Sequence, residues 1–353
     1  MIVKKLKMLS LVSFFIAFAS LVLSACPGGG SGSGTQGKTL SAVQERDSLL
    51  CGVSTGLAGF SNPDSSGNWA GLDVDICRAV AAAVLGDSEK VTYVPLTAKE
   101  RFTALQSGEV DVLSRNTTWT ITRDTSLGLS FVGVNYYDGA GFLVKKSKGV
   151  NRISQLNGAT VCIQAGTTTE LNLADHFLKN NLKYTPITFE TSQQTKDGFV
   201  NGRCDALTSD TSQLASIRST LADPSSAVIL GEVISKEPLG PVVRQGDDQW
   251  FNINRWALYV MIAGEEYGIT SANVDDIRNN SDSPEIKRML GVEENSGSDL
   301  GIDNNWAYNI LSQVGNYGES FNRNVGAGSP LGLPRGVNAL WTDGGLLYAM
   351  PFR

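Results

Sequence analysis

The sequence predicts an α/β fold built from two similar units. Short apolar runs of strand length alternate with stretches whose apolar residues recur at helical spacing, which indicates parallel β–α–β units. One pattern also occurs twice: a helical stretch ends at a glycine, Gly-x-x-Asp follows, and a short apolar strand leads to a polar residue. The copies are Gly108–Asn116 and Gly202–Asp210. We therefore expect two α/β units that each present polar groups at a strand end.

The first unit is expected to begin with a strand over 49–53 and a loop over 54–71. Asp73, like Asp75, is expected to cap the helix that follows, because a carboxylate at a helix start can accept from free backbone N–H groups. Thr97-x-x-Glu100 is typical of a capping box at the start of the next helix. Strands are predicted over 91–94 and 110–113.

In the second unit, Thr167-x-x-Glu170 is another capping-box pattern, and it follows a predicted strand. A helix start after a strand is also an anion site, so capping and anion binding explain these threonines equally well. The run 235–244 predicts an extended return to the first unit, and Asp248 is expected to open a long helix. The tail 324–353 has no assignable pattern.

Composition and motif content limit the classes of function that the chain can have. The 353 residues suffice for two domains, 18% charged residues argue against disorder, and a net charge of −6 argues against nucleic acid as a partner. His176 is the only histidine and is expected within a helix. The sequence contains no P-loop, no dinucleotide fingerprint and no metal-ligand spacing. No catalytic group, cofactor or metal is therefore predicted.

The N-terminus predicts a targeting segment. Three lysines precede an apolar run that ends at Leu23-Ser24-Ala25-Cys26, which resembles the lipobox of bacterial lipoproteins. Residues 1–25 are then a signal peptide, Cys26 is the lipidated first residue, and 26–38 are a flexible tether. The expected location is the periplasm or the outer face of the cell membrane, with a lipid anchor. A transmembrane anchor or an ordinary signal peptide is the alternative.

Four further cysteines remain, and an even number in an exported chain suggests disulfides. Three connectivities are possible. Because each unit holds two cysteines, the favoured pairs are Cys51–Cys77 and Cys162–Cys204. Buried free thiols are the alternative.

The polar stretch 113–124 marks the candidate site. Its hydroxyls, its amide and its two guanidiniums follow a predicted strand, and ligands bind beyond such strand ends in open α/β sheets. This composition suits a small anion such as a carboxylate, although a solvated loop is the simpler alternative. Asp210 stands at the matching place of the second unit. Together the two strand ends could hold both charges of a zwitterion.

The chain resembles the periplasmic amino-acid-binding proteins that serve ABC transporters, in particular the general L-amino-acid-binding branch. The resemblance runs from about residue 40 to the C-terminus. It rests on these segments: Cys51–Ser54 with Gly59–Pro63, Gly71–Asp75, Lys99–Gly108, Ser114–Thr120, Gly166–Glu170 and Ser235–Pro241. It implies a two-lobed type II periplasmic-binding-protein fold with two hinge strands. Lobe 1 would be 39–143 plus 241–353, and lobe 2 would be 144–240.

The resemblance also implies the site. Arg123, in the Thr120-x-x-Arg123 run, corresponds to the arginine that binds the ligand α-carboxylate, and Asp210 to the aspartate that binds the α-ammonium. Arg115 has no counterpart, which leaves a preference for acidic side chains open. Further contacts are expected at Thr118, Asn116, Thr168, Thr167 and Phe60.

The implied function is capture of a free L-amino acid by a monomer that delivers it to an ABC transporter permease, without chemistry. Two alternatives remain. One is an enzyme on the same fold, such as a cyclohexadienyl-type dehydratase, which would need a general acid or base in the cleft. The other is a ligand-sensing domain.

Overall fold

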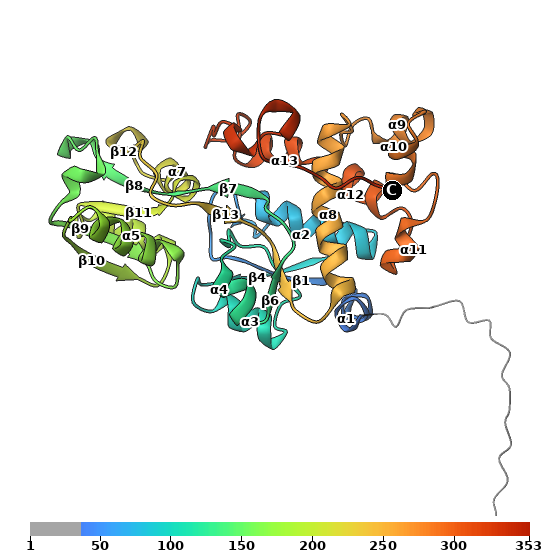
Figure 1. Ribbon diagram of the computed structural model, residues 1–353, viewed down its shortest axis with the longest axis horizontal. Coiled ribbons are helices and arrows are strands. Elements are labelled where there is room, and N and C mark those ends of the chain that lie inside the picture. Colours follow the sequence, from blue (N-terminus) through green and yellow to red (C-terminus); the bar gives the residue numbers. More distant parts are fainter. Residues whose placement is uncertain (1–36) are drawn as a thin grey trace, which may run out of the picture. The chain divides into compact units, whose positions relative to one another are not determined.

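The computed structural model describes residues 37–353 (Figure 1). The expected signal peptide, Cys26 and all but the last two residues of the 26–38 tether lie outside this range. The first described element is α1 (Lys38–Arg46), a helix that no sequence pattern predicts. Leu40 and Val43 are fully buried on it, so packing against the first lobe explains why this short helix forms.

The first lobe contains a five-stranded sheet in the order β4-β1-β5-β14-β6. Strand β1 is parallel to β4 and β5, whereas β14 returns antiparallel to β5 and β6. The strands are β1 (Leu49–Ser54), β4 (Val91–Leu96), β5 (Val112–Leu113), β6 (Leu129–Phe131) and β14 (Val242–Arg244). The helices are α2 (Leu72–Leu85), α3 (Arg101–Ser107), α4 (Ile121–Ser126) and α8 (Asp248–Glu266), and a small hairpin pairs β2 (Asn62–Pro63) with β3 (Trp69–Ala70).

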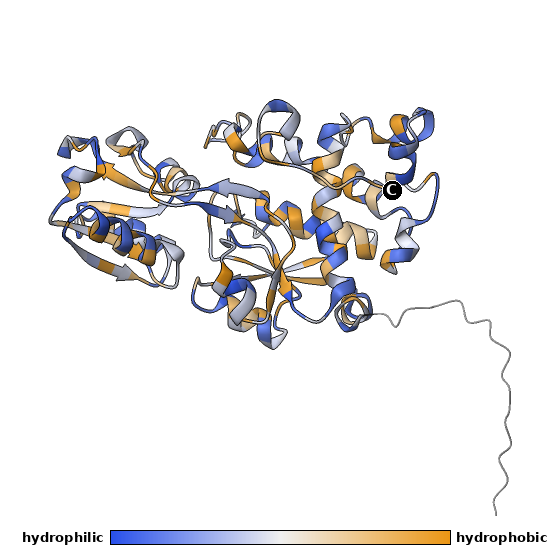
Figure 2. Ribbon diagram, in the orientation of Figure 1, coloured by the Kyte–Doolittle hydropathy of each residue, from blue (hydrophilic) through white to orange (hydrophobic). Residues whose placement is uncertain are grey.

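The second lobe repeats this plan with the sheet order β10-β9-β11-β8-β12. Its strands are β8 (Ala140–Lys145), β9 (Ala159–Gln164), β10 (Tyr184–Phe189), β11 (Ala206–Asp210) and β12 (Ala227–Ile229). Its helices are α5 (Thr168–Lys179), α6 (Ser192–Val200) and α7 (Thr211–Ser219), with short 3₁₀ turns at 146–148, 153–156 and 224–226. Apolar residues follow the strands of both sheets (Figure 2), so each lobe has its own core.

Two antiparallel strands, β7 (Tyr136–Asp138) and β13 (Glu237–Leu239), connect the lobes (Figure 1). The lobe boundary expected at residue 143 differs from the one that strand pairing defines. All of β8 pairs with β11 and β12 of the second sheet, so the second lobe begins at Ala140. Residues 140–144 form a continuous apolar run, so the sequence gives no signal at the point where the chain enters the second sheet.

The C-terminal part packs on the first lobe through α2 and α8. Its helices are α9 (Val274–Asn280), α10 (Pro284–Met289), α11 (Ser296–Leu300), α12 (Trp306–Gln313) and α13 (Tyr317–Asn324), followed by 3₁₀ turns at 336–338 and 341–343. The tail, which had no assignable pattern, reaches β7: Asn338 accepts from the Tyr137 N–H (2.6 Å) and donates to the Tyr137 carbonyl (3.0 Å).

Asp73 and Asp75 do not cap α2, contrary to expectation. The N-cap is Gly71, and both carboxylates are buried in the first turn of the helix. The backbone at Gly71 has φ 141°, and an added Cβ would lie 2.1 Å from the Phe60 carbonyl oxygen, so only glycine can begin the helix here. Asp75 instead accepts from α13, through Ser320 (2.5 Å) and Arg323 (2.7 Å).

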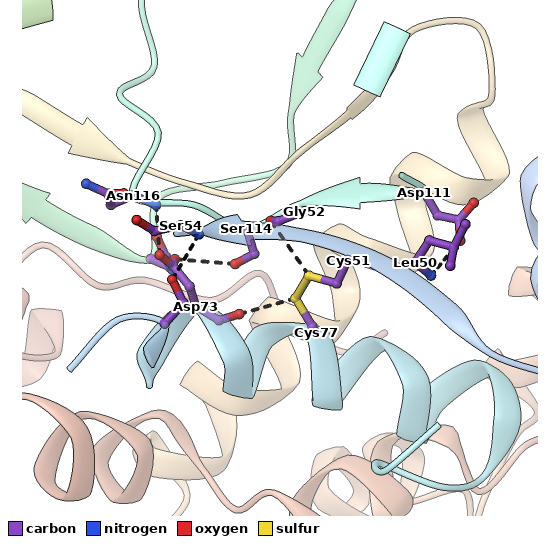
Figure 3. Close-up of a disulfide and its surroundings, with 11 residues drawn as sticks. Leu50, Cys51, Gly52, Ser54, Asp73, Cys77, Asp111, Ser114 and Asn116 are labelled. Atoms are coloured by element: carbon purple, nitrogen blue, oxygen red, sulfur yellow. Dashed lines mark hydrogen bonds between the residues drawn. A yellow bond between two sulfur atoms is a disulfide. The ribbon is translucent and has the colours of Figure 1, made fainter. Parts of the chain in front are cut away.

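The four cysteines of the described chain form two disulfides, Cys51–Cys77 and Cys162–Cys204. The first ties β1 to α2 (Figure 3), and the second ties β9 to the turn before β11. Each bond lies within one lobe, so neither restricts motion at the hinge strands.

Replacing both Cys162 and Cys204 by serine is expected to lower the free energy of unfolding by about 2–4 kcal/mol. The bond closes a loop of sequence separation 42, and removing it returns conformational freedom to the unfolded chain. Urea unfolding of both proteins measures the difference. Equal midpoints and slopes would contradict the prediction.

Candidate functional site

The candidate site lies beyond the carboxyl ends of β5 in the first lobe and β11 in the second. A cavity of about 10 Å³ is enclosed there. Its lining residues are Arg101, Arg115, Asn116, Thr118, Gln164, Thr167, Thr168, Thr169, Ser209, Asp210 and Gln213. A space of this size holds about one water molecule, so a larger ligand would need the cavity to widen.

Five of the seven expected ligand contacts line this cavity: Asn116, Thr118, Thr167, Thr168 and Asp210. Phe60 does not. It is buried in the core of the first lobe, where its ring meets that of Tyr136 edge to face at 5.5 Å. The expectation that Phe60 covers the ligand is therefore not supported by its position.

Arg123 lies beside the cavity and is not part of its lining. Its guanidinium donates to the Thr118 carbonyl (2.9 Å) and lies 5.1 Å from the centre of the Phe102 ring. Burial lowers the pKa of Arg123, while the carboxylates of Glu237 and Asp210 act in the opposite direction. Arg123 therefore fixes the backbone of Thr118, which does face the cavity.

Asp210 is the acidic group of the site. It is the N-cap residue of α7, yet its side chain makes no capping hydrogen bond. Burial raises its pKa well above the usual range, and the neighbouring carboxylates Asp138 and Glu237 raise it further, while Arg101 and Arg123 oppose the shift. A cation placed at this carboxylate would favour its ionised form.

The structure adds two arginines to the site that the resemblance did not assign. Arg101 and Arg115 both line the cavity and are almost fully buried. Arg101 donates to Thr117 (3.4 Å), and its Nε has no partner. Arg115 donates to the Leu96 carbonyl (3.0 Å), and burial lowers its pKa to about 10. The first lobe thus offers positive charge opposite Asp210.

The start of α5 lines the same cavity through Thr167, Thr168 and Thr169. Thr167 is its N-cap residue, but its hydroxyl donates to the Gln164 carbonyl (2.8 Å) and does not cap the helix. Glu170 accepts from the Gly166 N–H (2.8 Å), so the expected capping box is absent. The Thr168 hydroxyl donates to Glu237 (2.8 Å) and lies 3.4 Å from the Thr118 hydroxyl of the other lobe. Uncapped N–H groups at this helix start favour an anion.

Asp73 supports the loop that carries Asn116 (Figure 3). Its carboxylate accepts from the Asn116 N–H (2.8 Å) and from the Ser114 hydroxyl (3.3 Å). Burial raises the pKa of Asp73 to about 6, although these hydrogen bonds and the charge of Arg115 act against the shift.

This pKa predicts a pH-dependent stability difference between wild type and Asp73→Asn. A pKa of about 6 in the folded state, against about 3.9 unfolded, means that the folded chain binds more protons between pH 4 and 6. Asp73 therefore costs wild type up to about 3 kcal/mol of stability as pH rises through this range. Asparagine has no such dependence. Urea unfolding at pH 4, 5, 6 and 7 measures the difference, and a constant difference would contradict the prediction.

Residues 37–353 contain no helix with the length and apolar character needed to cross a membrane. Nor does this part of the chain hold a cluster of three or more His, Cys, Asp or Glu side chains that could bind a metal ion.

Two α/β lobes, two connecting strands and a polar cavity at the strand ends define a type II periplasmic-binding-protein fold. The chain belongs to family 3 of the bacterial extracellular solute-binding proteins, whose sequence model matches residues 49–272. The fold class and the family expected from the sequence are thereby confirmed.

Three relatives cover most of the chain. It is 58% identical over 323 residues to the general L-amino acid-binding periplasmic protein AapJ of Rhizobium johnstonii, covering 91% of this chain and 94% of the relative. It is 53% identical over 336 residues to the glutamate/glutamine/aspartate/asparagine-binding protein BztA of Rhodobacter capsulatus. This match covers 95% of this chain and 98% of the relative. The structure also resembles that of an ABC transporter periplasmic binding protein from Brucella ovis with glutathione bound, with a TM-score of 0.88 and 55% sequence identity. This match covers 89% of this chain and 99% of the Brucella ovis chain.

Proposed function

We propose that this chain is the extracytoplasmic substrate-binding component of an ABC transporter, and that it captures free L-amino acids between its lobes and delivers them to the permease. The observation that carries the proposal is the charge arrangement of one cavity. Arg101 and Arg115 of the first lobe line it together with Asp210 of the second. A zwitterion presents the two opposite charges that such a cavity can pair.

Within this proposal, Arg123 holds the α-carboxylate and Asp210 holds the α-ammonium. A guanidinium offers a planar fork that matches a carboxylate, and a buried carboxylate without a capping bond can accept from an ammonium. Thr118 would donate its hydroxyl to the same carboxylate. The Thr168 hydroxyl already donates to Glu237 (2.8 Å), so Thr168 would meet the carboxylate through its backbone N–H at the start of α5. Because every amino acid shares these groups, the proposal favours a binder of several amino acids.

Calorimetric titration with each of the twenty L-amino acids tests the proposal. We expect binding in the micromolar range, about −8 kcal/mol, for at least several of them. The matching D-amino acids are the control, because they present the same groups in the wrong arrangement. Absence of binding for all twenty L-amino acids would overturn the proposal.

Glutathione is a second candidate ligand, because the Brucella ovis protein has it bound. Its γ-glutamyl end carries the same α-amino and α-carboxylate groups, and its second carboxylate could meet Arg101 or Arg115, both of which line the cavity. Titration with reduced glutathione and with its glycine ethyl ester, in which that second carboxylate is masked, separates the contributions of the two ends. A chain that binds glutathione and no free amino acid would be a peptide-binding component.

We further propose that the chain is not an enzyme. The only histidine, His176, lies in α5 with its ring beside Phe177 and is absent from the cavity lining. AapJ and BztA are both named as binding proteins. The fold is shared by an ancestral amino-acid-binding protein described as a precursor of cyclohexadienyl dehydratase (29% identity, TM-score 0.56). Incubation with prephenate, followed by product detection, therefore tests for dehydratase activity.

The proposed anchor predicts an acylated Cys26 as the first mature residue, because small residues precede that cysteine in the lipobox-like run. Two acyl chains would hold the protein stably at a membrane. Mass spectrometry of detergent-extracted protein should find the modified N-terminal peptide, and should lose it in Cys26→Ala. A wild-type chain that begins after residue 26 would contradict the prediction.

A further inference from the structure

A hydrogen bond between two buried amides joins the lobes at the edge of the cavity. Asn116 Nδ2, after β5 of the first lobe, donates to Gln213 Oε1 in the first turn of α7 of the second (3.1 Å). Both side chains are less than a tenth exposed. The amides also have partners in their own lobes: Arg115 donates to Asn116 Oδ1 (3.3 Å), and Gln213 Nε2 donates to the Ser192 hydroxyl (3.3 Å).

The backbone of Asn116 has a conformation that few residues adopt. Its φ is 31°, in the left-handed region, where asparagine is tolerated better than most side chains. The Asp73 carboxylate accepts from the Asn116 N–H at 2.8 Å, and α2 anchors that carboxylate in the first lobe. Asn135, just before the hinge strand β7, donates to the same carboxylate (3.5 Å). Asp73 thus fixes the loop in the conformation that points the Asn116 amide at Gln213.

We propose that Asn116 is not a ligand contact but one half of an interlobe latch with Gln213, and that Asp73 is its positioning residue. Separating the lobes breaks the Asn116–Gln213 bond, whereas the bonds of Asp73 lie within the first lobe and persist. A contact present in only one of two conformations stabilises that conformation alone. The latch therefore slows the release of ligand from the closed form. This inference rests on the proposed capture of ligand by lobe closure.

Stopped-flow measurement of L-glutamine dissociation tests the latch. Asn116→Gly keeps the left-handed backbone and removes the amide, and Gln213→Ala removes the partner. Each is expected to raise the dissociation rate roughly three- to tenfold. The double variant should raise it no further, because both substitutions delete the same interlobe hydrogen bond. If the fold-increases of the two single variants multiply in the double variant, each residue acts on its own, for example by contacting the ligand. That result would overturn the latch.

Matched controls exist in the second lobe. Asn181 is also a left-handed asparagine (φ 54°), and Gln193 is an exposed glutamine that donates to Asp197. Asn181→Gly and Gln193→Ala should leave the dissociation rate unchanged. Asp73→Asn should raise the rate in the wild-type background but not in Asn116→Gly, since glycine needs no help to adopt this φ. An equal effect of Asp73→Asn in both backgrounds would show a merely structural role.

Crosslinking separates failure of the latch from failure of the proposed function. Asn116→Cys combined with Gln213→Cys places two thiols at the lobe contact, while the four cysteines already in the described chain are paired in disulfides. A short bis-methanethiosulfonate reagent should join the new thiols without added ligand. If the variant crosslinks but the protein binds no amino acid, the interlobe contact is supported and the proposed ligand is wrong. No crosslink, with or without L-glutamine, would overturn the latch.

Discussion

Asp210→Asn is expected to weaken the binding of every L-amino acid that wild type binds by at least about 30-fold. Among residues 37–353, Asp210 is the one carboxylate that lines the cavity at the proposed α-ammonium site. Losing one partner of a desolvated charge pair costs ~2–5 kcal/mol, and each 1.4 kcal/mol is tenfold in affinity. Asparagine keeps the shape of the side chain, so the effect reports the charge. Calorimetry measures it, and the melting temperature without ligand shows that the variant is folded.

Because the pKa of Asp210 is raised, the affinity for ligand is expected to depend on pH. In the free protein its carboxyl binds a proton at higher pH than an ordinary aspartate, whereas a ligand ammonium needs the ionised form. Affinity should therefore fall as pH is lowered, and the fall should begin well above pH 3.8. In that range binding should release a proton, which titration in buffers of different ionisation enthalpy detects. Asp210→Asn should lose this proton release.

Asp223→Asn is the matched control, since it removes an exposed carboxylate of the same lobe that only caps a 3₁₀ turn. Its affinity and proton release should equal those of wild type. If Asp210→Asn is folded and binds within threefold of wild type, Asp210 does not hold the ammonium.

The two strand ends of the site are predictable from the sequence because they follow local patterns. Asn116 and Asp210 come at matching distances after two Gly-x-x-Asp runs, and both line the cavity. The prediction that Asp73 caps α2 was wrong because tertiary contacts decide where this helix begins. Capping preference depends on the local chain alone, whereas the close approach of Gly71 to Phe60 moves the helix start and turns Asp73 toward the loop.

Other parts of the site gave no local signal. Arg101 opens a helix whose apolar face suggested only a core element, and Gln213 looks like any polar helical residue. Their role depends on where two distant strands end. The tail likewise takes its shape from contacts with the first lobe and with β7, such as those of Asn338. Its backbone has little regular structure, so no periodic pattern could predict it.

The second large effect is expected at Arg123. Arg123→Ala should reduce affinity for all bound L-amino acids by at least about 30-fold, because the proposed carboxylate anchor is lost and the Thr118 carbonyl loses a buried donor at 2.9 Å. Arg123→Lys should bind weakly as well. A lysine keeps the charge, but its ammonium is a point donor that cannot reproduce the planar fork toward a carboxylate. Calorimetry against the same set of amino acids measures both variants.

Two further variants make this result decisive. Arg203→Ala is the matched control, because Arg203 also lies 5.1 Å from the centre of a phenylalanine ring but on the exposed surface of the second lobe. It should bind like wild type. Arg101→Ala tests the competing anchor, since Arg101 lines the cavity and has an unpaired Nε. If Arg123→Ala keeps its affinity within threefold and Arg101→Ala loses it, the α-carboxylate is held by Arg101, and the match of Thr120-x-x-Arg123 to the family pattern reflects support of Thr118 alone.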